Sequence, residues 1–111
     1  MAMHTFVFFL TLAYTQDSAS KIENIRRMLA AAPPHEPDYA ELDQLVHQFK
    51  GSSASLGAKA LTHLCVQLRS ACGEHNRQGC ALIAQQMEEA YQVLRVKLQE
   101  LMAADAARRA S

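Results

Sequence analysis

A histidine, a lysine and a glycine lie close together in the segment LVHQFKGSSASLGA, residues 45–58. A neutral imidazole such as that of His47 is a nucleophile near neutral pH, since its unperturbed pKa is about 6.5. Lys50 follows one helical turn later, where its ammonium can donate hydrogen bonds to an anionic group. Gly51 removes a side chain from the next turn. The three residues together suit attack by the imidazole on a reactive group that a second protein brings up to it.

A helix is needed to present these residues in one geometry. Read as a helix, the segment places its apolar residues on one stripe: Leu42, Leu45, Val46 and Phe49. At the helical period, His47 projects roughly 140° and Gly51 roughly 180° away from Leu42. A glycine inside a helix costs about 1 kcal/mol relative to alanine. We therefore expect Gly51 to serve access, because a β-carbon there would obstruct a second protein that approaches His47.

The composition excludes several classes of function. The chain has 111 residues, enough for one core, and Lys plus Arg balances Asp plus Glu at 11 each. That balance provides no basic field for nucleic acid or for an anionic membrane. Only 4 glycines and 3 prolines are present, and Ala, Leu and Gln are abundant. This composition favours an all-α domain.

Three cysteines, Cys65, Cys72 and Cys80, are present and none of them forms a Cys-x-x-Cys pair. An odd number without that spacing supports neither a disulfide framework nor a standard zinc site. We expect reduced and mostly buried thiols in a cytosolic protein, with no metal site.

Four amphipathic segments predict a single domain over residues 1–111, an antiparallel four-helix bundle with helices at about 4–31, 38–54, 56–75 and 77–104. The stretch Ala30–Pro37 contains three prolines and separates the first predicted helix from the second. Asp38 is the expected N-cap of the second helix, and Ser55 that of the third.

The apolar run FVFFLTLA at residues 6–13 permits two interpretations. A secretory signal would make this a small secreted helical protein, but no Lys or Arg precedes Lys21. The run is also far shorter than the ~20 residues that span a bilayer. The favoured interpretation is the first long helix of the bundle.

The wider pattern resembles the signature of histidine-containing phosphotransfer (HPt) proteins, in the motif His47-x-x-Lys50-Gly51-Ser52-Ser53-x-x-Leu56-Gly57-Ala58. With Cys65, Arg69, Cys72 and the segment 74–80 included, the plant cytokinin-relay branch is the most similar. The resemblance extends from about residue 6 to about residue 102.

This resemblance implies a phosphorelay intermediate. His47 would accept a phosphoryl group from the receiver-domain aspartate of a hybrid histidine kinase and pass it to response regulators, with Lys50 assisting. The acidic pocket and Mg²⁺ of such a relay belong to the receiver, so no cofactor, metal, ATP site or autokinase activity is expected here. The resemblance also implies a monomer in the cytoplasm and nucleus.

Further residues surround the predicted acceptor. Gln48 and Ser52 are expected at the rim of the site. Arg69 is expected either to donate to the phosphoryl group or to Gln48, or to be an ordinary surface arginine. Asp43 lies one turn before His47 and would either orient the imidazole or favour the early turns of the helix. Ser53 is expected to bond a backbone carbonyl near the helix end.

The chain departs from the plant family at its start, because two further helices usually precede the long one in that family. Their absence would leave apolar residues exposed near the N-terminus and would permit self-association. It also motivates an alternative function, a truncated module that binds receivers without transferring phosphate and competes with full-length relay proteins.

Overall fold

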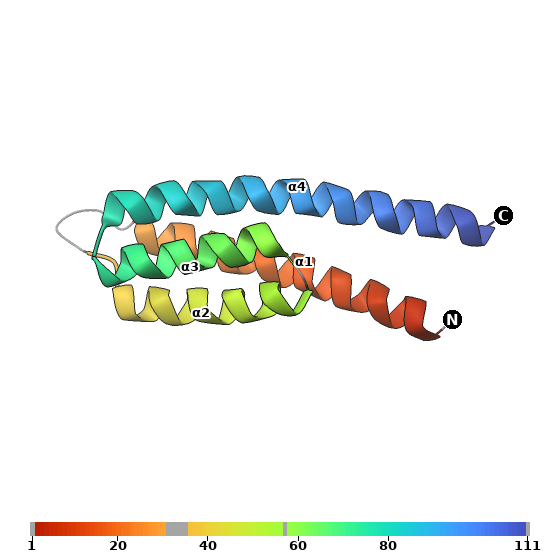
Figure 1. Ribbon diagram of the computed structural model, residues 1–111, viewed down its shortest axis with the longest axis horizontal. Coiled ribbons are helices and arrows are strands. Elements are labelled where there is room, and N and C mark those ends of the chain that lie inside the picture. Colours follow the sequence, from red (N-terminus) through yellow and green to blue (C-terminus); the bar gives the residue numbers. More distant parts are fainter. Residues whose placement is uncertain (1, 31–35, 57, 111) are drawn as a thin grey trace.

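The computed structural model describes residues 2–30, 36–56 and 58–110. These residues form four helices, α1 (Ala2–Leu29), α2 (Tyr39–Leu56), α3 (Lys59–Gly73) and α4 (Arg77–Ala110). Consecutive helices alternate in direction along the long axis of the molecule (Figure 1). The predicted all-α antiparallel four-helix bundle is therefore confirmed.

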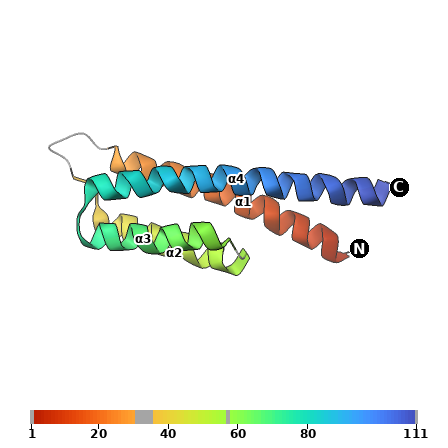
Figure 2. The same ribbon diagram turned by 45° about the horizontal axis from the view of Figure 1, so that its top comes forward.

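The helices pack as a closed ring, in which α1 contacts α2, α2 contacts α3, α3 contacts α4, and α4 contacts α1. In both views the longer helices α1 and α4 run past the end of the α2–α3 pair (Figures 1 and 2). The stripe of α4 loses its cover along this extension: Tyr91 is 5% exposed, whereas Leu101 is 66% exposed. Only the part of the bundle beside α2 and α3 has all four helices around its core.

The core is one cluster of apolar side chains to which every helix contributes. Its largest fully buried members are Phe49, Ile22, Ile25, Leu42, Leu61, Leu68, Met87 and Val46. Full burial of such a side chain stabilises the fold by about 1.5–3 kcal/mol. The stripe predicted for the motif helix is part of this cluster, so its opposite side is left for solvent and partners.

The starts of α2 and α3 confirm one predicted N-cap and contradict the other. The Asp38 carboxylate accepts a hydrogen bond from the Glu41 N–H at 3.1 Å, so the predicted N-cap is confirmed. The prediction for Ser55 is wrong, because α2 continues to Leu56 and the Ser55 hydroxyl donates to the Gly51 carbonyl at 3.0 Å. Ala58 stands at the N-cap of α3 without a side-chain hydrogen bond. The Ser55 hydroxyl therefore forms its hydrogen bond within α2 and does not cap α3.

The later helix ends also differ from prediction. The third helix, predicted to run to residue 75, ends at Gly73, and His75 lies beyond it with a left-handed φ of 53°. The His75 ring stacks on Tyr39 with centroids 4.4 Å apart, which holds this connection against the start of α2. The last helix extends past its predicted end to Ala110. Residues 31–35 of the predicted proline-rich break, and Gly57 of the motif, lie outside the described residues.

Buried hydroxyls tie α1 to its neighbours. The Ser53 hydroxyl is buried and forms a hydrogen bond of 2.9 Å with the Tyr14 hydroxyl, which corrects the prediction that it bonds a backbone carbonyl. The Tyr91 hydroxyl donates to the Thr15 carbonyl at 2.9 Å. These contacts fix α1 against both α2 and α4. Among the described residues, no helix combines the length and hydropathy required to cross a membrane.

The three thiols are buried, as predicted, and this gives the fold an alkaline limit. Burial raises the pKa of Cys65 to about 11 and that of Cys72 to about 12, from an ordinary 9.0. Above about pH 9 the unfolded chain loses these protons first, so it binds fewer protons than the folded chain and stability falls. We expect the free energy of unfolding in urea to drop between about pH 8 and about pH 10.5, on the order of 1 kcal/mol per thiol.

A Cys65→Ala variant is the control for this effect, since it should show a shallower dependence of stability on alkaline pH than the original chain. Equal unfolding free energies at the two pH values would contradict the assignment.

Candidate functional site

His47 lies on α2 with its side chain exposed. The side chains beside it in the sequence that face the core, Val46 and Phe49, are fully buried. A rigid helix therefore presents the imidazole outward, as its angular position predicted. The ring is available to a partner and is not packed in the interior.

The backbone near His47 is uncovered. Within the described part of the chain, a methyl group built on Gly51 would meet no atom beyond its own helical turn within 4 Å, so no described helix covers this side of α2. The glycine is also exposed. Packing within the chain therefore gives no reason for a glycine here, and the predicted role in access agrees with the open space.

Arg69 links α3 to the histidine on α2. Its Nη1 lies 3.0 Å from Nδ1 of the His47 ring. Its other two donors reach the Asp43 carboxylate, with Nε 3.0 Å from Oδ1 and Nη2 3.4 Å from Oδ2. The hydrogen bond to Asp43 raises the pKa of Arg69 above its already high ordinary value, so the guanidinium stays charged.

These contacts resolve alternatives that the sequence left open. Arg69 lies against the imidazole and forms no hydrogen bond with Gln48. Asp43 holds Arg69, so its influence on His47 passes through the guanidinium. The side chains of Arg69 and Asp43 are 36% and 39% exposed, and water therefore screens their ion pair. The ion pair therefore contributes more to the position of the Arg69 side chain than to the stability of the fold.

The remaining predicted residues surround this group without a shared network. Lys50 is half-buried and, among the described residues, its ammonium has no ion-pair partner. Gln48 is exposed on the same helix as His47. The Ser52 hydroxyl donates to the Phe49 carbonyl at 3.1 Å, which leaves its oxygen free to accept. An unpaired lysine one turn from His47 can be drawn to an incoming anion.

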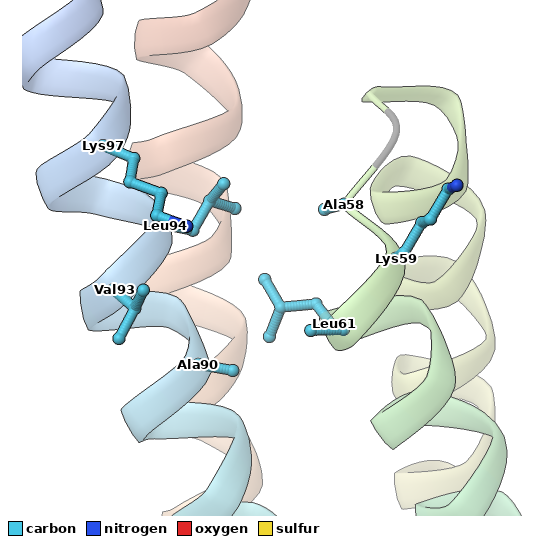
Figure 3. A pocket seen from close by; sticks show the side chains of 8 residues that line it. Ala58, Lys59, Leu61, Ala90, Val93, Leu94 and Lys97 are labelled. Carbon is cyan, nitrogen blue, oxygen red and sulfur yellow. The ribbon is translucent and has the colours of Figure 1, made fainter.

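An open groove lies in another part of the molecule, between the start of α3 and α4. This open groove of about 190 Å³ has a mainly apolar lining, and Leu61 and Leu94 point toward each other across it (Figure 3). Lys59 and Lys97 lie at the groove, but none of the predicted site residues lines it. His47 and Gln48 are exposed side by side on α2, and such an open helix surface suits a protein partner better than a small molecule.

The chain belongs to the Hpt domain family, which matches residues 10–106 and so includes every predicted site residue. Histidine-containing phosphotransfer protein 5 of Arabidopsis thaliana is 36% identical over 85 residues, which are 77% of this chain and 54% of that protein. Histidine-containing phosphotransfer protein 4 of the same plant is 37% identical over 94 residues, 85% of this chain and 72% of that protein.

Some relatives carry a different description. Pseudo histidine-containing phosphotransfer protein 1 of Oryza sativa subsp. japonica is 32% identical over 98 residues, 88% of this chain and 51% of that protein. The chain spans about half the length of several of the curated relatives that it matches.

Solved structures agree with the family. A histidine-containing phosphotransfer protein from maize superposes with a TM-score of 0.85 at 30% identity, covering 92% of this chain and 72% of that one. A relative from Medicago truncatula gives a TM-score of 0.88, also at 30% identity, covering 95% and 69%. The bundle and its helix order are thus those of plant histidine-containing phosphotransfer proteins.

Proposed function

We propose that His47 accepts a phosphoryl group from the aspartyl phosphate of a hybrid histidine kinase's receiver domain and passes it to response regulators. The observation that supports this most is the exposed imidazole beside the open flank of Gly51, in a chain of the Hpt domain family. A ring that stands clear of its own fold can enter a second protein's active site.

The reaction needs little from this chain beyond a nucleophile and positive charge. A ring nitrogen of His47 forms the N–P bond while the P–O bond to the receiver aspartate breaks and its electron pair returns to the carboxylate. Such transfers depend on alignment and charge neutralisation. Lys50 and Arg69 supply cationic donors on this side. We expect Mg²⁺ to come with the receiver, and no cofactor or metal to be required here.

A labelled receiver tests the proposal. The purified chain is mixed with a receiver domain phosphorylated on its aspartate, and transfer of label is followed with time. We expect acid-labile label on this chain, mapped to the peptide that contains His47, and its later appearance on a second receiver. Label that never leaves the first receiver would overturn the proposal.

A second candidate function predicts a different result in the label-transfer experiment. The chain spans about half the length of several relatives, and the alternative function is a module that docks on receivers without transferring phosphate. In that case it would bind a receiver, receive no label, and slow transfer to a full-length relay protein. The rate of onward transfer, compared with a full-length relative, separates the two functions.

The proposal extends to assembly and place of action. We propose a cytokinin-relay protein that acts as a monomer in the cytoplasm and nucleus. Self-association would use apolar side chains of α1 that are exposed, at 60% for Phe9, 48% for Leu10 and 37% for Leu12. Sedimentation at increasing concentration distinguishes a monomer from an association through these residues.

Gly51→Ala should separate stability from transfer. Alanine is favoured over glycine in a helix by about 1 kcal/mol, and the added methyl meets no described atom beyond its own helical turn, so the free energy of unfolding should rise by about that amount. The same methyl stands on the surface that a receiver must approach. We expect a transfer rate lower by about tenfold to hundredfold, since small misplacements of reacting groups are costly.

Denaturant unfolding and a transfer time course measure the two effects. Gly73→Ala is the control for the gain in stability, because a methyl there also meets open space and lies at the last residue of α3, one turn beyond Arg69. A Gly51→Ala protein with unchanged transfer would show that the glycine does not serve access.

A further inference from the structure

The contact between Arg69 and His47 specifies where the ring carries its proton. A guanidinium has hydrogen-bond donors and no acceptor, so at 3.0 Å from Nη1 the His47 Nδ1 must be the acceptor. A neutral imidazole has one proton, and with the lone pair on Nδ1 that proton lies on Nε2. The unbound protein therefore holds His47 as its Nε2–H tautomer.

This tautomer cannot attack through Nε2, the ring nitrogen that Arg69 leaves uncovered. The Nδ1 lone pair is covered by Arg69, and the Nε2 nitrogen, which forms no hydrogen bond within the described part of the chain, has a proton in place of a lone pair. Attack through Nε2 needs the proton to move to Nδ1, where an N–H would then face the donors of Arg69. The two groups cannot both keep their positions during the reaction.

We propose that Arg69, held by Asp43, is a latch on the histidine, which keeps Nδ1 occupied in the free protein and must leave it before Nε2 can attack a phosphoryl group. This rests on the proposed function of His47. The latch makes Arg69 and Asp43 positioning residues in the unbound state, whose effect on the reaction passes through the ring's tautomer.

The atoms and charges balance through each step. Arg69 leaves Nδ1, and water carries the ring proton from Nε2 to Nδ1. The Nε2 lone pair forms the bond to phosphorus as the aspartyl P–O bond breaks toward the carboxylate. The Nδ1 proton is then lost to water, and Nδ1 regains the lone pair that Arg69 can bind again.

The geometry explains how release can occur without loss of the arginine. Nε and Nη2 of Arg69 remain on the Asp43 carboxylate, while Nη1 alone contacts the ring. An arriving phosphoryl group offers charged oxygens, which are stronger acceptors for Nη1 than a neutral nitrogen. Because both side chains are over a third exposed, such a shift meets little packing resistance.

Nitrogen-15 NMR of the ring tests the latch on the full chain, unphosphorylated and at mildly alkaline pH, where an imidazole is neutral. We expect the His47 Nδ1 signal to be that of a nitrogen with a lone pair and the Nε2 signal that of an N–H. Arg69→Ala should shift the tautomer ratio toward Nδ1–H by about tenfold, the value of one charge-assisted hydrogen bond. Asp43→Ala should shift it in the same direction by less.

The matched control is Arg27→Ala, which removes an exposed arginine of α1 that pairs with Glu23. It should leave the His47 signals unchanged, and circular dichroism checks that each variant keeps its helices. A wild-type ring protonated on Nδ1, or an equal ratio in wild type and Arg69→Ala, would overturn the latch. Neither result depends on phosphate. Absence of label on His47 with the expected tautomer would instead overturn the relay function.

Discussion

His47→Gln is expected to abolish acceptance of phosphoryl groups from a receiver while leaving the helical content of the protein unchanged. Glutamine has no nucleophilic ring nitrogen, so the N–P bond cannot form, and none of the flanking residues offers a substitute. Because His47 is exposed, its replacement should change the free energy of unfolding by no more than about 0.5 kcal/mol. Label transfer from a phosphorylated receiver and circular dichroism give the two measurements.

His63→Gln is the control for this experiment. His63 is also exposed, and it lies on α3, where its ring contacts Gln67. It has neither a lysine nor a glycine one turn later, so its loss should leave transfer within about twofold of the original rate. A His47→Gln protein that still became phosphorylated in acid-labile form would show that another residue is the acceptor.

The bundle could be predicted from the sequence because the spacing of apolar residues along each helix shows which side is buried. Each helix repeats its apolar residues at the helical spacing, and residues such as Leu42, Val46 and Met87 face the core whatever the details of their neighbours. The outward direction of the His47 side chain follows from the same rule. His47 lies away from the apolar stripe of α2, and that stripe must face the core.

Contacts between helices could not be predicted in this way, because they depend on how one helix is rotated and shifted against another. The sequence marked Asp43 and Arg69 as residues near His47, but their separation of 26 positions says nothing of the pairing that joins them. Ser53 shows the same limit. Local rules assign its hydroxyl to a carbonyl of its own helix, whereas the structure places Tyr14 of α1 within 2.9 Å.

The position of the acceptor also depends on what lies beneath it. Phe49 is two residues from His47, is fully buried, and is among the largest side chains of the core. The Lys21 ammonium lies 6.0 Å from the centre of its ring, at the outer limit of a cation–π contact. Burial of this ring in the shared core anchors α2, and with it the positions of His47 and Asp43.

Phe49→Ala should therefore be the most destabilising single change considered. Removal of a buried phenylalanine costs about 3–5 kcal/mol, from lost transfer free energy and the remaining cavity, against a total stability of about 5–15 kcal/mol for a domain. We expect the melting temperature to fall by roughly 10–20 °C. Phe9→Ala is the matched control, since this side chain is 60% exposed and its loss should cost less than about 1 kcal/mol. Thermal unfolding followed by circular dichroism compares the two, and equal losses would mean that Phe49 does not anchor α2.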